Sequence, residues 1–210
     1  MGITERRQRE KEALSQKIID AAREIFIREG YNAVTMRRIA DKIEYSATAI
    51  YSHFKDKDSL LRAITAADFR AMTESLHELG NVSDPIEKLR LMAHAYVEFG
   101  VTHPNQYRLI FMTRQPHYST RVAEELHGDP EQDPYAWVIH ILKESIRAGN
   151  LKCSEQDLDL LAQTLWSAFH GLVSLHISLG EEPWVEWTPV KARVDAMFEM
   201  LLTGMLARRG

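Results

Sequence analysis

A short run of the sequence combines small, hydroxyl-bearing, aromatic and basic residues in a pattern that suits contact with a polyanion. Four small residues, 46–49, are followed by Tyr51, His53 and Lys57. Small side chains let a helix backbone approach the base edges in a major groove about 12 Å wide. Hydroxyl, imidazole and ammonium groups at the next positions can bind phosphates. The run therefore favours contact with double-stranded DNA.

Two short helices joined by a tight turn are needed to present this run. Thr35 and Ser46 are expected to cap them, because a Ser or Thr at the N-cap accepts a backbone N–H that the helix leaves unpaired. Helices of about eight residues at this separation have the dimensions of a helix-turn-helix. Apolar residues at helical spacing predict the inward faces: Met36, Ile39, Ala40, Ile43, Ile50 and Phe54.

The rest of the chain also predicts helices, and we find no period-two strand pattern. Helices are expected around 14–29, 58–76, 85–103, 104–111, 137–148, 154–179 and 190–205, with a polar, proline-containing loop within 115–135. The predicted fold is all-α with about nine helices. We expect residues 1–57 to form a three-helix DNA-binding head, and residues 58–210 to form a helical bundle for ligand binding and dimerisation.

Composition limits the class of protein. The chain has one cysteine, Cys153, so it has no internal disulfide and no cysteine-based zinc site, which suits a reducing cytosol. We find no secretory signal and no apolar run near the ~18 residues that span a membrane. Residues 1–55 carry 11 Lys/Arg against 8 Asp/Glu, whereas the whole chain has a net charge of −4. A basic head on an acidic body suits a polyanion partner.

The spacing around the helix-turn-helix resembles the signature of the tetracycline-repressor (TetR) family. The matching positions are Thr35, Ile39, Ala40, Ser46, Ile50, Tyr51, His53, Phe54, Lys57 and Leu60. A shorter pattern, Trp166-x-x-x-His170-Gly171, resembles the WHG type of C-terminal domain found in some members. The resemblance implies a cytoplasmic, ligand-responsive dimeric repressor of a palindromic operator, with no catalytic residue, cofactor or metal.

The same resemblance implies roles for individual residues. Arg37, Ala47 and Thr48 would lie at base-reading positions, while Thr35 and Ser46 would cap their helices and touch phosphate. Tyr51, His53 and Lys57 would hold the DNA backbone. The implied DNA-binding residues are Thr35, Arg37, Tyr45, Ser46, Ala47, Thr48, Tyr51, His53 and Lys57.

The basic N-terminal stretch has two interpretations. Arg6, Arg7, Arg9 and Lys11 could add a minor-groove or phosphate contact, as N-terminal arms can. Alternatively, the stretch is a solvated tail.

One position departs from the family pattern. Members usually have a glycine in the turn, where this chain has Glu44. The left-handed backbone conformation costs roughly 1 kcal/mol of stability for a residue other than glycine. We therefore expect Glu44→Gly to raise thermal stability without abolishing DNA binding.

The body carries aromatic, histidine and methionine residues that could line a largely apolar pocket for an unknown small-molecule effector. Each of them could equally be an ordinary core residue, and His170 could bond across helices while Gly171 allows close approach. The candidates are Met92, Tyr96, Phe99, His103, Tyr107, Phe111, Trp137, Trp166, Phe169 and His170.

The last two long helices predict a homodimer interface. The helix over 154–179 is apolar nearly all round, so both of its sides need a cover, and a two-fold partner would supply the second. The candidate interface residues are Leu161, Leu165, Leu172, Leu179, Val194, Phe198, Leu201 and Met205.

A helical-bundle di-iron enzyme is the alternative that we weighed. It needs two Glu-x-x-His units and two further Glu, and the chain has Glu74-x-x-His77 and Glu124-x-x-His127. Chance accounts for about as many such units. We find no P-loop, Gly-x-Ser-x-Gly or Cys-x-x-Cys motif.

Overall fold

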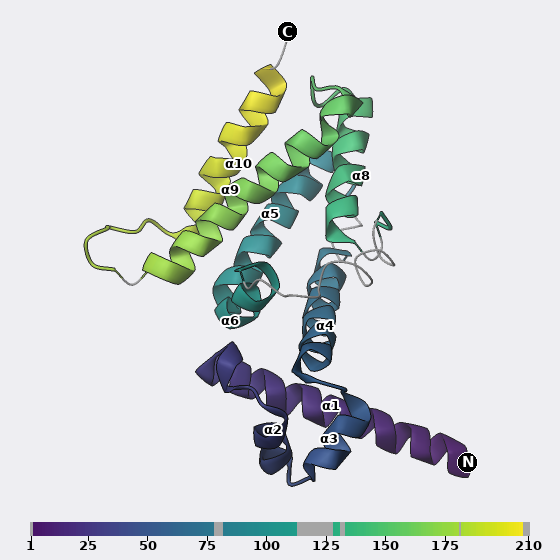
Figure 1. Ribbon diagram of the computed structural model, residues 1–210. Helices are drawn as coiled ribbons and strands as arrows, with labels where there is room; N and C mark the ends of the chain where they lie inside the picture. Colours follow the sequence, from purple (N-terminus) through teal and green to yellow (C-terminus); the bar gives the residue numbers. More distant parts are fainter. Residues whose placement is uncertain (1, 78–81, 113–127, 131–132, 181, 208–210) are drawn as a thin grey trace. The chain divides into compact units, whose positions relative to one another are not determined.

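The computed structural model describes residues 2–77, 82–112, 128–130, 133–180 and 182–207 (Figure 1). Those residues are arranged as helices and connections, with no strand among them, which confirms the all-α prediction. None of the helices in the described part is long and apolar enough to cross a membrane.

The chain forms two compact units, residues 1–69 with 108–118 and residues 70–107 with 119–210. The division falls inside helix α4 (Lys57–His77). The domain boundary that we expected from the sequence, between 57 and 58, coincides instead with the start of this helix.

The first unit is built on α1 (Ile3–Glu29), followed by the 3-10 turn η1 (Tyr31–Ala33), α2 (Met36–Ile43), α3 (Ala47–His53), the first part of α4 and the π-helical turn η3 (Arg108–Met112). Its apolar core draws on all of these helices. The fully buried members include Ile18, Ala22, Val34, Ile39, Ile50, Leu60, Ile64 and Leu109. This core fixes α2 and α3 against α1.

The N-terminal stretch is a continuation of α1. The helix begins at Ile3, whereas the sequence pattern indicated helix only from about residue 14. Residues 4–13 are exposed, and pairs four residues apart connect them, such as Arg6 Nε to Glu10 Oε1 at 2.8 Å. Such pairs add a few tenths of a kcal/mol each to an exposed helix. The stretch is therefore an exposed helical extension of α1, and its contact with DNA stays a prediction.

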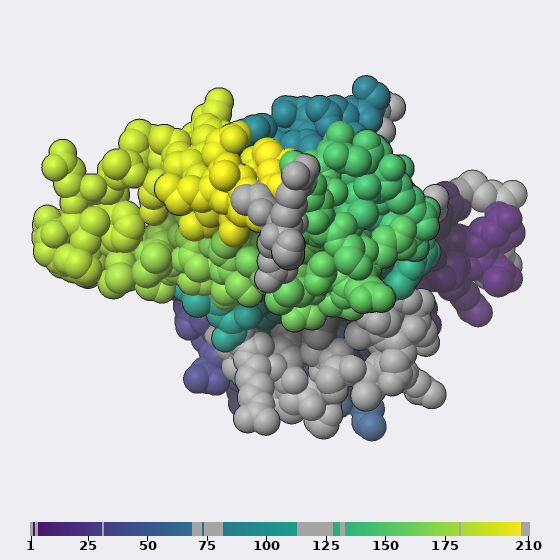
Figure 2. All heavy atoms as spheres, turned by 90° about the horizontal axis from the view of Figure 1, so that it is seen from above, coloured from purple at the N-terminus to yellow at the C-terminus, as the bar shows by residue number. Residues whose placement is uncertain are grey.

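The second unit contains α5 (Pro85–Thr102), α6 (Pro104–Tyr107), α8 (Pro134–Arg147), the 3-10 turn η4 (Glu155–Asp157), α9 (Leu158–Leu179) and α10 (Val190–Ala207). Helix α9 packs on α5, α8 and α10. In Figure 2, α10 in yellow lies along the lighter green part of α9. This arrangement gives α9 an inner face toward its own unit and an outer face.

The close approach of α5 and α9 occurs at Gly100. A Cβ atom at Gly100 would overlap Cγ1 of Val173 and lie 2.9 Å from Cδ2 of Tyr107. A Cβ atom at Gly171 would meet nothing within 4 Å. The expectation that Gly171 permits close helix contact is therefore wrong within the single chain, and Gly100 fills that role.

Candidate nucleic-acid interface

Both helices of the helix-turn-helix begin at the predicted caps. Thr35 Oγ1 accepts the backbone N–H of Arg38 at 3.2 Å, and Ser46 Oγ accepts that of Ala49 at 3.2 Å. Each bond satisfies an N–H that the first turn cannot pair internally. The start of each helix is thus fixed by local sequence.

The turn between α2 and α3 depends on Glu44, which has φ 61° and ψ 40°. It is the one non-glycine residue with positive φ in the part of the chain that the structure describes. The N–H of Glu44 is bonded to the carbonyl of Asp41 at 3.4 Å, and that of Tyr45 to the carbonyl of Ala40 at 3.0 Å. These two bonds form a Schellman motif, which usually has glycine at the left-handed position. Glu44 therefore adopts the conformation expected where the family has glycine.

Helix α3 has one buried face and one open face. Ile50 is fully buried and Phe54 is nearly so, and both belong to the core of the first unit. Ala47 and Thr48 are exposed, and Tyr51 is 54% exposed. His53, at the end of the helix, is half-buried. The open face therefore begins with small residues and continues with an aromatic hydroxyl.

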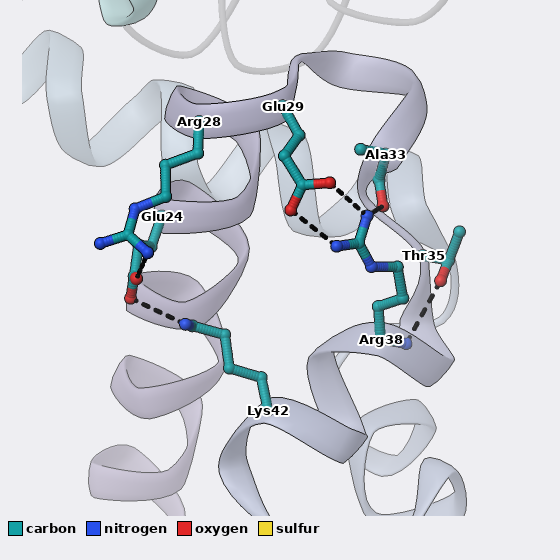
Figure 3. A network of polar contacts seen from close by, with 7 residues as sticks. All are labelled: Glu24, Arg28, Glu29, Ala33, Thr35, Arg38 and Lys42. Atoms are coloured by element: carbon teal, nitrogen blue, oxygen red, sulfur yellow. Dashed lines mark hydrogen bonds and ion pairs between the residues drawn. The ribbon is translucent and has the colours of Figure 1, made fainter.

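The adjacent arginines of α2 have different surroundings. Arg38 donates two hydrogen bonds to the Glu29 carboxylate, at 2.6 and 2.9 Å, and a third to the carbonyl of Ala33 at 3.1 Å (Figure 3). Arg37 is exposed. Arg38 is thus committed to the junction between α1 and α2, and Arg37 is open to a partner.

A second ion pair holds the other end of α2. Lys42 Nζ lies 3.0 Å from Glu24 Oε2, and Arg28 Nη1 lies 3.1 Å from Glu24 Oε1 (Figure 3). The hydrogen bond from Lys42 lowers the pKa of Glu24, and the hydrogen bonds from Arg38 lower the pKa of Glu29. Sequence periodicity does not reveal the Lys42–Glu24 and Arg38–Glu29 pairs, because each joins α2 to α1, whereas Arg28 and Glu24 are four residues apart on α1.

The start of α4 differs slightly from the sequence prediction. The helix begins at Lys57, one residue before the predicted 58, and Asp56 caps it, since its Oδ1 accepts the backbone N–H of Ser59 at 2.7 Å. Ser59 Oγ in turn accepts the N–H of Asp56 at 3.2 Å. Lys57 follows at the first helical position, and partial burial lowers its pKa. These two hydrogen bonds between Asp56 and Ser59 fix the start of α4, so Lys57 lies directly after the α3–α4 connection.

Two family descriptions match the chain. Residues 18–64 match "Bacterial regulatory proteins, tetR family", and residues 89–205 match "Tetracyclin repressor-like, C-terminal domain". The second match alone covers more than half of the chain. The protein belongs to the tetracycline-repressor family.

Curated relatives of this TetR-family chain match over part of their length. The transcriptional repressor AcnR of Corynebacterium diphtheriae is 37% identical over 67 residues, which are 32% of this chain and 35% of that protein. AcnR of Corynebacterium efficiens is 29% identical over 134 residues, which are 63% and 61% of the two chains. The chain therefore spans about a third to three fifths of the curated relatives that it matches first.

Solved structures share the fold over nearly the whole chain. A Rhodococcus sp. RHA1 protein described as of unknown function has a TM-score of 0.77 at 21% identity, covering 92% of this chain and 95% of that one. FadR of Bacillus subtilis, described as a complex with stearoyl-CoA, has a TM-score of 0.71 at 20% identity, covering 90% and 98%. At these identities the likeness shows the fold alone.

In the second unit of the TetR-family chain, four candidate effector residues meet in a hydrogen-bonded chain. Trp166 Nε1 donates to the Tyr96 hydroxyl at 3.0 Å, and the hydroxyls of Tyr96 and Tyr107 are 2.7 Å apart. The Tyr107 hydroxyl lies 2.7 Å from His170 Nδ1, and His170 Nε2 lies 3.2 Å from Ser174 Oγ. We call these five residues the polar chain. It links α5, α6 and α9.

Burial keeps the polar chain uncharged near neutral pH. It raises the pKa of Tyr96 to about 12, although hydrogen bonds with Tyr107 and Trp166 act in the opposite direction. Burial also raises the pKa of Tyr107 and lowers that of His170. With His170 neutral, its Nδ1 can accept from Tyr107 and its Nε2–H can donate to Ser174.

The other candidate effector residues are dispersed. Phe99 stacks on His103, with ring centroids 5.2 Å apart, and Phe169 is buried. Met92 and Trp137 are half-buried. Phe111 lies in the first unit, not in the body as the sequence interpretation assumed.

Most of the candidate dimer residues face the interior of their own chain. Six of them are buried, and Leu179 and Leu201 are half-buried. Side chains that are already buried within the chain can add little area to a dimer interface. The better candidate for the interface is therefore the outer faces of α9 and α10. Their exposed apolar members are Leu160, Trp166, Leu175, Met200 and Leu206.

The structure gives no support to a metal centre in the part of the chain that it describes, where no group of three or more potential ligands occurs. The Glu124–His127 unit lies outside the described residues, and so do the side chains of Glu74 and His77.

Proposed function

We propose that this protein is a dimeric transcriptional repressor, which binds a palindromic operator through α2, the turn and α3 and releases it when an effector binds the second unit. The observation that best supports this proposal is that α3 has one buried face and one exposed face. Ile50 and Phe54 hold it on the core, which leaves Ala47, Thr48 and Tyr51 exposed. A recognition helix needs this exposure to enter a major groove.

Base reading is assigned to Arg37, Ala47 and Thr48. An arginine can bind guanine through two hydrogen bonds, and alanine or the threonine methyl can contact the thymine methyl. All three side chains are exposed. Ala47 and Thr48 lie on the first turn of α3, which is the part of a helix-turn-helix that contacts base edges. Arg37 lies on the first turn of α2, and its assignment rests on the resemblance to the family.

Phosphate contacts are assigned to Thr35, Ser46, Tyr51, His53 and Lys57. Tyr51 and the two caps are exposed, and the hydroxyl groups can donate to phosphate oxygens. His53 and Lys57 are half-buried, which suits side chains that reach the backbone from the edge of the helix. Such contacts fix register and carry no base preference.

Dimerisation is assigned to the outer faces of α9 and α10. Leu175 and Met200 are exposed there, and a Cβ at Gly171 or Gly204 would meet nothing within 4 Å. A two-fold partner would cover these side chains and use the open space at the glycines. Two heads could then read half-sites about 34–36 Å apart.

The effector is assigned to the region of the polar chain. A ligand that binds one conformation better than another shifts the population by that difference in affinity, and operator affinity falls accordingly. FadR of Bacillus subtilis is described with stearoyl-CoA, so long acyl-CoA thioesters belong in an effector screen. We further propose that the protein acts in the cytoplasm and has no catalytic role.

Binding of the purified protein to DNA upstream of its own gene, by gel shift in moderate salt with excess nonspecific competitor, tests this proposal. We expect a specific complex with two protomers per operator. If that DNA is not bound, selection from genomic fragments identifies the operator. Failure to select any fragment would overturn the proposal.

A further inference from the structure

The basic side chains of the first unit fall into two groups. In one group each cation is already paired with a carboxylate of the same unit, as Arg23 is with Asp20 and Asp68 at 3.0 and 2.9 Å. Paired cations gain little from a phosphate, since the carboxylate must first be given up. The paired group contains Arg6, Arg23, Arg28, Arg38 and Lys42.

Lys17 belongs to the other group. It is exposed on α1, and no carboxylate of the described residues lies within ion-pair distance of its ammonium. Its neighbour is instead an aromatic ring, because Nζ lies 5.6 Å from the centroid of Tyr45. A cation over a ring face is attracted by the ring quadrupole and keeps its full charge.

Tyr45 is itself held by the turn. Its backbone N–H is bonded to the carbonyl of Ala40 at 3.0 Å, and the next residue is Ser46, the cap of α3. Its side chain is 44% exposed. The ring therefore keeps the Lys17 ammonium beside the start of the recognition helix. In helix-turn-helix proteins this end of the helix enters the groove, between the phosphates that line it.

We propose that Lys17 is a DNA-phosphate contact of the repressor and that Tyr45 acts as its platform rather than as a hydrogen-bonding partner of DNA. The inference rests on the proposed function. A lysine ammonium is a compact charge on a flexible stem, which suits a phosphate better than a base edge. The inference assigns a role to Lys17, which lies outside the helix-turn-helix motif, and it revises the role of Tyr45.

The salt dependence of operator binding tests the role of Lys17. Each neutralised phosphate contributes about 0.9 to the slope of log K against log salt concentration. Lys17→Gln is expected to reduce the slope by about 1 for each protomer, which is about 2 for a dimer. Lys42→Gln removes the same charge from a lysine already paired with Glu24, so its slope should equal that of the wild type.

Two substitutions of Tyr45 test the platform. Tyr45→Phe keeps the ring and should retain the wild-type affinity and slope. Tyr45→Ala should resemble Lys17→Gln, and the double variant should lose little more than either single variant. Circular dichroism and melting temperature establish that each variant is folded.

The outcomes separate this inference from the function on which it rests. If the wild type binds its operator and Lys17→Gln keeps the full slope, Lys17 contacts no phosphate and the inference is overturned. A loss with Tyr45→Phe equal to that with Tyr45→Ala would show that the hydroxyl contacts DNA, which overturns the platform. Absence of specific binding by the wild type would overturn the proposed function and this inference together.

Discussion

Single residues of the head divide into those that hold it together and those that are open to DNA. Arg38 and Arg37 are neighbours in sequence, yet the first makes three hydrogen bonds within the unit and the second is exposed. Glu44 is a structural residue of another kind, since it adopts the left-handed conformation that favours glycine although it carries a Cβ atom. Substitutions at such residues should separate effects on stability from effects on binding.

Replacing Glu44 with glycine should stabilise the protein. Relief of the left-handed strain is expected to add about 1 kcal/mol to the free energy of unfolding, or about 2–4 °C in Tm for a chain of this size. Glu44→Ala is the matched control, because it removes the carboxylate but keeps a Cβ. Thermal melts should show a higher Tm for Glu44→Gly and no increase for Glu44→Ala. A lower Tm for Glu44→Gly would reveal a stabilising contact of Glu44 in the native protein.

Replacing Tyr51 and Thr48 should affect operator binding differently. Tyr51→Phe removes a proposed phosphate contact, so it should weaken binding to all sequences to a similar extent. Thr48→Ser removes the methyl group, so it should relax preference at one base pair, where a contact is worth about 1–3 kcal/mol. Binding measured against an operator library with one substitution at each position distinguishes them. Equal profiles for the two variants would refute the assignment.

At the scale of elements, the polar chain joins three helices through side chains that are far apart in sequence. Tyr107 is fully buried on α6 and stacks on His170 of α9, with ring centroids 5.6 Å apart. His170 follows the buried Phe169 on α9 and is bonded to Ser174 as well as to Tyr107. Its neutral form completes the chain, so the packing of α6 on α9 should depend on its protonation.

The stability of the protein should fall as His170 is protonated. Burial lowers the pKa of His170 in the folded state below its ordinary value of 6.5. Above that value the residue is neutral in both states and contributes no pH dependence. Below it the unfolded chain binds the proton more readily, so the free energy of unfolding decreases. We expect a lower Tm at about pH 5 than at about pH 7.5.

The variant His170→Gln isolates this effect. It should melt below the wild type at about pH 7.5, because it disturbs the bond with Tyr107, but should lose less Tm on acidification. The surface histidines are common to both proteins, so their contribution cancels in the comparison. An identical drop in Tm for the two proteins would mean that His170 does not titrate with folding.

At the scale of the whole molecule, the proposed function requires two heads on one operator. The exposed side chains of Leu175 and Met200, 50% and 74% exposed in the single chain, mark the surface on which dimerisation should depend. Substitutions there should therefore change assembly and operator binding together, whereas substitutions on the inner face of α9 should change folding.

A charge on the outer face of α9 should separate the protomers. Leu175→Glu places a carboxylate where a partner would bury it, and a buried unpaired charge costs several kcal/mol. We expect a monomer by light scattering and operator binding weakened at least about tenfold, which corresponds to about 1.4 kcal/mol. Lys152→Glu, at another exposed position, is the control. A Leu175→Glu protein that remains dimeric would exclude this face as the interface.

The sequence by itself determined the features that act over a few residues. The caps at Thr35 and Ser46 and the inward residues Ile50 and Phe54 follow from helix periodicity and local hydrogen bonding. The left-handed turn at Glu44 was expected from the resemblance to the family, which has a glycine there. These interactions join residues within about one helical turn, so their spacing is visible along the chain.

Only the tertiary structure decided which side of each helix is covered and which charges meet. It placed Leu161, Leu165 and Leu172 on the inner face of α9, because α5, α8 and α10 pack there. It also joined Arg38 to Glu29 and Tyr107 to His170. Contacts between helices depend on how the helices cross, and helical periodicity repeats along one helix without specifying its partner.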